Sequence, residues 1–263
     1  MLWVFAPSLT SRADRQADQY ENQNIVRERG VVDITGKTAL VTGANRGLGR
    51  HLAAELRDRG VRVYAAARDP QAVDLAGVTP IALDITDPAS VAAAARTASG
   101  VAILINNAGS STGSPLLTGN LAAIRLEMDT HFFGTLTVTR AFAPQLAAHP
   151  SSAVLNILSV LSWLSIPRSG AYSAAKSAEW SLTNALRLEL APQGTRVTAL
   201  HVGYMDTDMT RHLDVPKSDP ATIAKLAIDG IAAGDAEIIA DEISRRVLAG
   251  LSAGVAGLYP QVA

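Results

Sequence analysis

The chain has 263 residues, of which 48% are hydrophobic and 18% charged, and its formal net charge is −1. This length is enough to bury a full core in one domain or at most two, and the composition excludes a disordered chain. The near-zero net charge excludes a strongly basic surface for nucleic acid, and the absence of cysteine excludes disulfides, zinc–thiolate sites and cysteine nucleophiles.

The first 30 residues differ in composition from the rest of the chain. They begin with a short apolar run, residues 1–7, that lacks the positive flank of a signal peptide, and they continue as a polar stretch of mixed charge. We predict a polar N-terminal arm over residues 1–30 and one Rossmann-fold oxidoreductase domain over residues 31–263. No run approaches the roughly 20 apolar residues that a membrane helix needs, so we expect a cytoplasmic protein without a membrane partner.

From residue 31 onward, short apolar runs alternate with segments of helical periodicity. Apolar strands without polar alternation indicate a parallel sheet that is covered on both faces. Because crossovers in such sheets are right-handed, we predict a single-domain α/β Rossmann fold, a doubly wound parallel sheet with helices on both faces. The expected strands are residues 38–42, 61–66, 80–84, 101–105, 153–157, 196–202 and 237–240. The expected helices are residues 50–59, 89–97, 121–148 with a candidate bend at Pro144, 172–190, 222–233 and 244–253.

A glycine-rich turn, residues 42–49, joins the first expected strand to the first expected helix. Its glycines let a pyrophosphate approach the backbone, and the helix N-terminus offers free N–H groups and the positive end of the helix dipole. The position after a strand and before a helix makes the signal much stronger than the glycines alone. The turn therefore predicts a dinucleotide site formed by Gly43, Asn45, Arg46, Gly47, Leu48 and Gly49.

The end of the second strand normally selects the cofactor, because an acidic residue there binds a ribose hydroxyl and an arginine accommodates a 2′-phosphate. This strand ends at Arg68, and Arg46 in the glycine turn adds a second cation. Two cations suit a phosphate dianion better than a neutral hydroxyl, so we expect NADP(H) to be preferred. Asp69 keeps NAD(H) possible, since a shifted register would bring its carboxylate to the ribose.

Tyr172 and Lys176 open a predicted helix and, being four residues apart, share one of its faces. Carbonyl reduction needs a proton at the oxygen as hydride reaches the carbon, and tyrosine has an ordinary pKa of about 10. A nearby ammonium, together with an oxidised nicotinamide, favours the phenolate and is expected to draw that pKa toward the working range. Ser159, on the loop after the strand at 153–157, can orient the substrate oxygen by a hydrogen bond. These three residues are the predicted catalytic group.

Together these segments resemble the classical short-chain dehydrogenases/reductases, of the NADP-dependent carbonyl reductase type. Ser159 precedes Tyr172 by thirteen residues, a spacing often seen in that family. The resemblance covers about residues 35–209 and rests on residues 42–49, Asp84, residues 106–109 (Asn-Asn-Ala-Gly), Ser159, Tyr172 and Lys176.

The resemblance implies further contacts with the cofactor. Asp84 would accept a hydrogen bond from the adenine amino group beside the Ile85 backbone, and Lys176 would also bind the ribose hydroxyls next to Tyr172. The loop at residues 201–207 would read the nicotinamide carboxamide. The cofactor contacts that this implies beyond the glycine turn and Arg68 are Asp84, Ile85, Asn107, Ala108, Gly109, Tyr172, Lys176, Gly203, Met205 and Thr207.

Two positions depart from the family pattern. Val202 stands before Gly203 where the family usually has proline, which removes rigidity but keeps the freedom of the glycine. His131 stands where an asparagine usually supports a water-linked proton relay to the lysine. A histidine there could carry protons itself or could simply pack beside the cofactor pocket, and the sequence does not choose between these readings.

The residues beside the catalytic group are mostly apolar, which favours a hydrophobic or aromatic small-molecule carbonyl or alcohol substrate, although Arg168 keeps a carboxylate possible. We predict NADPH-dependent reduction of a ketone or aldehyde, with no metal site. An NAD(P)-dependent sugar or polyol dehydrogenase, a cofactor-binding scaffold and a non-redox biosynthetic cyclase are the alternatives. By resemblance we expect a homodimer or homotetramer. The predicted substrate contacts are Ser159, Leu161, Trp163 and Tyr204, with Ser110 and Ile166 as further pocket candidates.

Overall fold

The computed structural model describes residues 32–261, so the expected arm over residues 1–30 lies outside the described part. Seven parallel strands form one sheet in the order β3-β2-β1-β4-β5-β6-β7. This confirms the predicted doubly wound sheet. The strands are β1 Thr38–Thr42, β2 Arg62–Ala67, β3 Thr79–Ala82, β4 Val101–Asn106, β5 Ser152–Ile157, β6 Thr195–His201 and β7 Glu237–Ile239.

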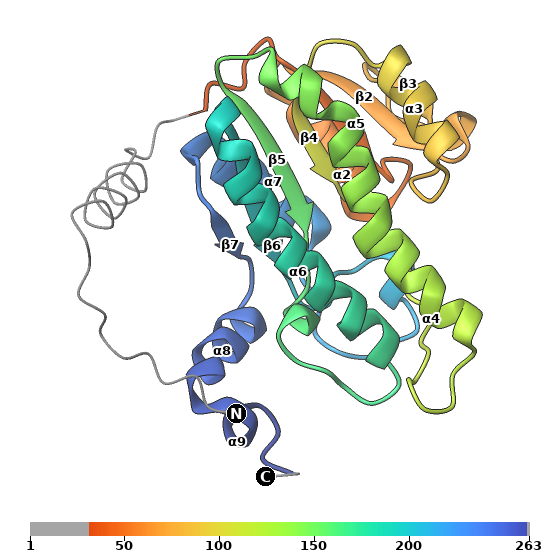
Figure 1. The fold of residues 1–263 in the computed structure, drawn as a ribbon, viewed down its shortest axis with the longest axis vertical. Helices are drawn as coiled ribbons and strands as arrows, with labels where there is room; N and C mark the ends of the chain where they lie inside the picture. The colour runs from red at the N-terminus through yellow and green to blue at the C-terminus, as the bar shows by residue number, and fades with distance from the viewer. Residues whose placement is uncertain (1–31, 262–263) are drawn as a thin grey trace, which may run out of the picture.

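Helices cover both faces of the sheet (Figure 1). The α2 and α7 helices pack on one face, and α3, α5 and α6 pack on the other. None of the helices within residues 32–261 is long and apolar enough to cross a membrane. The helices are α2 Gly47–Asp58, α3 Pro88–Thr97, α4 Leu121–Met128, α5 Thr135–Ala147, α6 Gly170–Leu190, α7 Pro220–Ala233, α8 Glu242–Gly250 and α9 Gly254–Leu258.

The strands supply side chains to two separate cores because successive residues of a strand point to opposite faces. Val41 packs toward α2 and α7, while its neighbour Leu40 packs toward α3, α5 and α6. Ile105 and Leu104 divide in the same way on β4. The apolar runs of the sequence therefore mark strands that are buried on both faces, as expected for a parallel sheet.

The long helix predicted over residues 121–148 is interrupted at a different place from the candidate bend. A π-helical turn, Asp129–Gly134, separates α4 from α5, whereas Pro144 lies inside α5. At this turn the helix lies against Ile85, because a Cβ on Gly134 would be 2.9 Å from the Ile85 side chain. Such turns insert an extra residue into a helix and often occur at functional sites. Here the turn carries His131.

The carboxyl ends of the strands gather the predicted site residues at one edge of the sheet. The chain leaves β1 toward β2 and β3, then returns on the other side of β1 to form β4. In doubly wound sheets, ligands bind in the crevice at this point of reversal. The turn after β1, the loops after β4 and β5, and the loop after β6 all open onto this edge.

Candidate active site

Side-chain hydrogen bonds tie the glycine turn after β1 to the end of β4. The Thr42 hydroxyl accepts from the backbone N–H groups of Asn107 and Ala108, each at 2.9 Å. Asn107 Nδ2 donates to the Thr42 carbonyl at 2.8 Å. The packing leaves no room for a side chain, because a Cβ on Gly49 would be 2.2 Å from the Gly43 carbonyl oxygen. Asn107 and Ala108 thus hold the turn from the neighbouring strand.

The N-terminus of α2 has the features of a phosphate cradle. Its N-cap residue, Arg46, makes no side-chain capping bond, and the first turn holds no acidic residue. The α3, α4, α7 and α8 helices instead begin with an Asp or Asn side chain that caps them. The first N–H groups of α2 are therefore left for a ligand, and the helix dipole favours an anion there. These residues fit the pyrophosphate of a dinucleotide.

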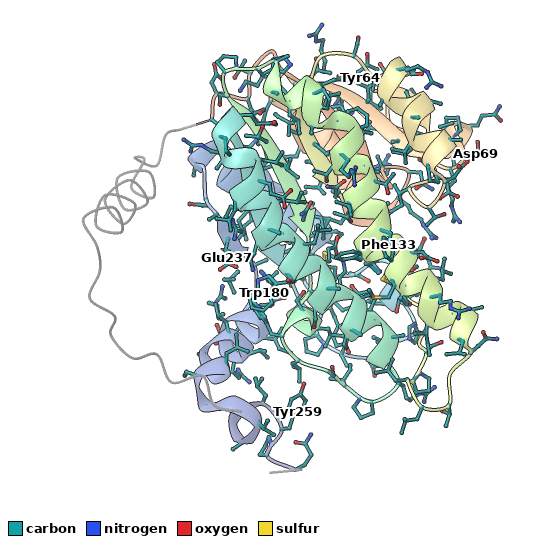
Figure 2. The ribbon with its side chains drawn as sticks, viewed as in Figure 1. Tyr64, Asp69, Phe133, Trp180, Glu237 and Tyr259 are labelled. Carbon is teal, nitrogen blue, oxygen red and sulfur yellow. The ribbon has the colours of Figure 1, made fainter. Side chains whose placement is uncertain are left out.

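The adenosine side of the crevice holds Arg68 and Asp84. Arg68 is exposed at the end of β2. Asp84 Oδ1 accepts from Thr86 N at 2.9 Å and Thr86 Oγ1 at 2.7 Å, and these bonds lower the pKa of Asp84. Asp69, at the outer edge of the sheet (Figure 2), accepts from Gln71 N at 2.9 Å and so caps a short turn. One oxygen of the Asp69 carboxylate is thus held by the backbone of its own turn.

The loop after β6 reaches the glycine turn from the other side. Gly203 N donates to Asp241 Oδ2 at 2.6 Å, which anchors the loop to the start of α8. Val202, in place of the usual proline, is buried, and its carbonyl accepts from Val160 N at 3.0 Å. Thr207 Cγ2 lies 3.4 Å from the position that a Cβ on Gly47 would take. The loop therefore keeps a fixed path without the proline.

The loop after β5 and the first turns of α6 bring Ser159, Tyr172 and Lys176 together. Lys176 Nζ donates to the Ile157 carbonyl at 2.7 Å and lies 5.8 Å from the centroid of the Tyr172 ring. Ser159 is buried, and its hydroxyl accepts from Leu161 N at 3.1 Å. The tyrosine is half-buried at the same edge of the sheet. The geometry is that of an acid/base group with a cation beside it.

The side chains around Tyr172 shift its pKa upward, whereas the sequence expectation combined the Lys176 ammonium with an oxidised nicotinamide. Burial raises the pKa most strongly, Lys176 lowers it, and Glu179 raises it again, so the pKa lies above its ordinary value. A hydrogen bond with Ser159 also lowers the Tyr172 pKa without reversing the outcome. The sequence prediction counted the ammonium of Lys176 but neither the burial of the phenol nor the carboxylate of Glu179.

Two buried carboxylates that the sequence analysis missed lie beside the catalytic group. Glu179 is 2% exposed, and its Oε2 accepts from Lys176 Nζ at 2.7 Å. Glu127 is fully buried, accepts from the Ser110 hydroxyl at 2.9 Å and from Thr112 N, and has its pKa lowered to about 2 by these bonds and by His131 despite the opposing effect of burial. The available signal was spacing, since Glu179 follows Lys176 by three residues and Glu127 precedes His131 by four.

His131 packs between these carboxylates and Tyr172. Its Nε2 lies 2.9 Å from the Ser110 carbonyl and 3.3 Å from Glu127 Oε2. The ring meets the Tyr172 ring edge-on at 5.2 Å between centroids. A Cβ on Gly109 would be 2.8 Å from His131 Cε1, so glycine is needed where the loop after β4 crosses the ring. A proton-carrying role for His131 stays one of the two readings that the sequence left open.

The predicted substrate residues lie in two kinds of surroundings. Trp163 is buried and stacks on His201 at 3.8 Å between ring centroids. It also meets the ring of Trp180 edge-on, and Trp180 is labelled on α6 in Figure 2. Burial lowers the pKa of His201 to about 4, so this ring is neutral at pH 7. Leu161 is also buried, whereas Tyr204 is half-exposed. With one ring face of Trp163 covered, its substrate contact stays a prediction.

Arg168, which kept a carboxylate substrate open, is exposed on the loop before Tyr172. It has a φ of +66°, the only positive φ of a non-glycine residue among residues 32–261. Ile166 is half-buried on the same loop. Such backbone strain is often found near functional sites, and Arg168 precedes Tyr172 by four residues.

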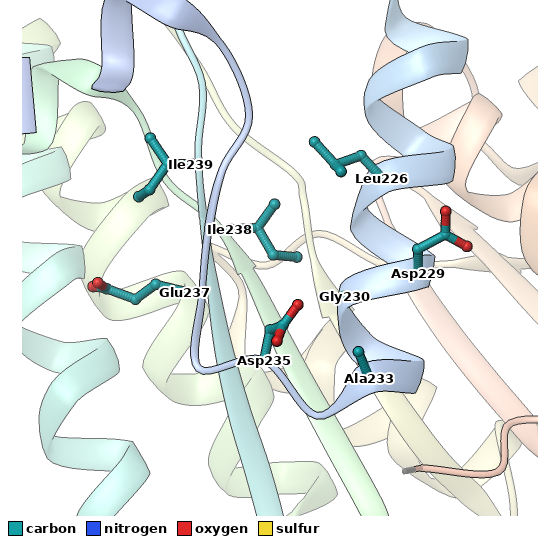
Figure 3. Close-up of a pocket in the computed structure, with 8 residues that line it drawn as sticks. All are labelled: Leu226, Asp229, Gly230, Ala233, Asp235, Glu237, Ile238 and Ile239. Atoms are coloured by element: carbon teal, nitrogen blue, oxygen red, sulfur yellow. The ribbon is translucent and has the colours of Figure 1, made fainter. Parts of the chain in front are cut away.

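A separate pocket of about 340 Å³ lies between α7 and β7 (Figure 3). It contains none of the predicted site residues. Within the described chain, no group of three or more His, Asp or Glu side chains is arranged to hold a metal ion. The lining residues are Leu226, Asp229, Gly230, Ala233, Asp235, Glu237, Ile238 and Ile239.

Known proteins are similar to this chain in sequence and in fold. Residues 37–217 match the sequence family described as short chain dehydrogenase. The chain is 32% identical over 180 residues to the NADPH-dependent 1-acyldihydroxyacetone phosphate reductase of Schizosaccharomyces pombe, a match that covers 65% of this chain and 60% of that protein. It is 34% identical to the 1-deoxy-11-beta-hydroxypentalenate dehydrogenase of Streptomyces avermitilis, covering 69% of this chain and 73% of that protein. A crystal structure of a short chain dehydrogenase from Burkholderia cenocepacia in complex with NADP has a TM-score of 0.83 and 35% identity, covering 87% of this chain and 98% of that one.

The chain belongs to the short-chain dehydrogenase/reductase family. The expected resemblance is thereby confirmed. The protein is an NAD(P)-dependent oxidoreductase that acts on alcohol or carbonyl groups of small molecules. An NADPH-dependent relative and an NADP-bound structural neighbour support the use of NADP(H).

Proposed function

We propose that this short-chain dehydrogenase/reductase uses NADPH to reduce a ketone or aldehyde to an alcohol, reversibly, with Tyr172 as the general acid/base. The observation that carries the proposal is the placing of Tyr172, Lys176 and Ser159 at the edge of the sheet where the phosphate cradle of α2 opens. The NADPH-dependent relative supports the same direction of reaction.

The chain's own residues account for the proton in this reaction. The bound cofactor supplies the hydride, which carries two electrons to the carbonyl carbon. As the C=O π bond opens, the substrate oxygen takes the proton of the Tyr172 hydroxyl, whose O–H bond breaks to leave a phenolate beside Lys176. Ser159 holds the substrate oxygen toward that proton. The mostly apolar surroundings favour an apolar carbonyl compound.

A substrate panel tests this function directly. We expect the full-length enzyme to oxidise NADPH in the presence of apolar ketones, aldehydes or quinones, measured by loss of nicotinamide absorbance. Preferential turnover of sugars or polyols with NAD⁺ would favour the alternative dehydrogenase. Tight NADPH binding without turnover of any carbonyl would contradict the proposal in favour of a scaffold or a non-redox enzyme. The expected homo-oligomer and the cytoplasmic location stay predictions.

The preference for NADP(H) over NAD(H) is also part of the proposal. Arg68 and Arg46 are both exposed, which leaves their side chains accessible to a 2′-phosphate and supports this preference. Arg46 is held only by a 3.4 Å pair with the exposed Asp208, which contributes little at the surface. One oxygen of the Asp69 carboxylate accepts from the Gln71 backbone, which also supports the preference.

We expect Arg68→Ala to weaken NADPH binding by about 10- to 100-fold, the value of one charge-assisted hydrogen bond to a phosphate. The Kd for NADH should change by less than about twofold, because NADH lacks the phosphate. Fluorescence titration with each cofactor measures both constants. Arg62→Ala is the matched control, since Arg62 is an exposed arginine at the opposite end of the same strand. Equal weakening of both cofactors would contradict the proposed preference.

A further inference from the structure

Lys176 is paired with a carboxylate that the proposed chemistry does not use. Its Nζ lies 2.7 Å from Glu179 Oε2 and 2.7 Å from the Ile157 carbonyl, and both charged side chains are buried. Glu179 Oε1 in turn accepts from the Thr135 hydroxyl at 2.9 Å. A carboxylate in direct contact with the ammonium opposes the field that the ammonium exerts on the Tyr172 ring.

The cation is therefore not the only charge that acts on Tyr172. Lys176 and Glu179 reach the ring from α6, and Glu127 adds a second carboxylate from α4. His131, on the π-helical turn, stands between the two carboxylates, with Nε2 3.3 Å from Glu127 and Nδ1 3.8 Å from Glu179. Two carboxylates face one ammonium, so the surroundings disfavour a further negative charge on the phenol.

Stability alone does not account for burying Glu179. A buried ion pair is often no more stable than apolar side chains of the same volume, because both ions lose their hydration. The neighbouring positions on this face of α6, Ala175 and Leu182, are apolar and buried. A carboxylate on the buried side of α6, in contact with the residue that sets the charge at Tyr172, points to a role in the proton chemistry.

We propose that Glu179 is a positioning residue that acts through Lys176 to keep Tyr172 in its phenol form, ready to donate a proton to a carbonyl oxygen. The proposal rests on the proposed reductase function, because only that direction begins from the phenol. Lys176 alone would favour the phenolate of Tyr172, and Glu179 opposes that effect. The consequence is a reductase whose general acid, Tyr172, stays protonated well into alkaline solution.

Two features of the structure agree with this role. Burial together with Glu179 places the pKa of Tyr172 above its ordinary value, even though Lys176 pulls it down. The pKa of Lys176 is raised as well, since Glu179 and the phenol outweigh its burial, so the ammonium keeps its charge. Glu179 therefore acts by balancing the ammonium, not by removing its proton.

The variant that tests the proposal is Glu179→Gln, which keeps the shape of the side chain and removes its charge. We expect the pKa of Tyr172 to fall by about 1 to 3 units, because the ammonium of Lys176 is then unbalanced. The readout is the ultraviolet tyrosinate absorbance of the full chain with saturating NADP⁺, after subtraction of the Tyr172→Phe titration. It needs no turnover. In the reduction of a carbonyl, the alkaline limb of the pH–rate profile should move to lower pH by the same amount.

Three further variants separate this role from a structural one. Glu179→Asp keeps the charge and should restore a titration close to that of the wild type. Glu127→Gln should lower the Tyr172 pKa less, because that carboxylate does not touch Lys176, and it supplies a second test if Glu179→Gln fails to fold. Glu189→Gln is the matched control, being the same substitution at an exposed position on the same helix. It should change neither titration nor rate.

The outcomes distinguish this inference from the proposed function. A Tyr172 titration that is the same in the wild type, Glu179→Gln and Glu127→Gln would overturn the role of Glu179, while carbonyl reduction by the wild type would still support the reductase. A lowered titration in Glu179→Gln, in an enzyme that reduces no carbonyl, would support the charge balance and contradict the proposed function.

Discussion

Replacement of Tyr172 by phenylalanine is expected to lower kcat for carbonyl reduction by about 10²- to 10⁴-fold, the range contributed by a positioned general acid. The Kd for NADPH should change little, because the substitution removes one hydroxyl at the crevice edge and leaves the phosphate cradle of α2 intact. The ring that meets His131 edge-on is also kept, so the fold should be retained. Steady-state kinetics and a cofactor titration on the same sample measure both effects.

The pH dependence gives a second check on Tyr172. A general acid must be protonated, and the pKa of this phenol is raised, so reduction should stay constant from neutral into alkaline solution and decline only above the ordinary tyrosine range of about 10. A decline that begins near neutral pH would instead place the titrating group elsewhere. Wild-type turnover retained in Tyr172→Phe would remove the phenol from the proposed mechanism.

The elements that the sequence predicted well are those whose signal is local. The glycine turn at residues 42–49 was recognised by its glycines, which let a pyrophosphate approach the backbone. The structure shows that a Cβ on Gly49 has no space. Tyr172 and Lys176 are found by their helical spacing together with the upstream strand, Ser159 and the glycine turn. The strands were recognised within one or two residues of their ends because a sheet buried on both faces needs continuous apolar runs.

The features that the sequence missed depend on tertiary contacts. Glu127 and Glu179 read as ordinary surface residues of two helices, since a glutamate is almost never fully buried without partners. Only the fold shows that the loop at residues 110–112 and Lys176 supply those partners. The upward effects of burial and of Glu179 on the Tyr172 pKa were missed for the same reason. The π-helical turn likewise has no local marker comparable with Pro144, which the helix tolerates.

Replacement of Lys176 by methionine is expected to lower the free energy of unfolding by about 3–5 kcal/mol, in addition to impairing turnover. The substitution fills a similar volume but leaves the carboxylate of Glu179 buried, with the Thr135 hydroxyl as its remaining hydrogen-bond donor. An uncompensated buried charge, not a lost packing contact, is the cause. Urea denaturation followed by circular dichroism measures the difference.

The double variant Lys176→Met with Glu179→Leu separates the stability of the pair from its chemistry. Removing both charges leaves no ion without a partner, so most of the lost stability should return, because apolar replacements of a buried ion pair are often neutral or better. Turnover should not return, since Lys176 is then absent from beside the phenolate that forms when Tyr172 gives up its proton. A double variant as unstable as the sum of the two single variants would show that the pair does not couple, and a double variant with restored turnover would show that Tyr172 needs neither charge. The double variant should therefore recover stability but not activity, because the fold tolerates removal of the Lys176–Glu179 pair whereas proton transfer by Tyr172 does not.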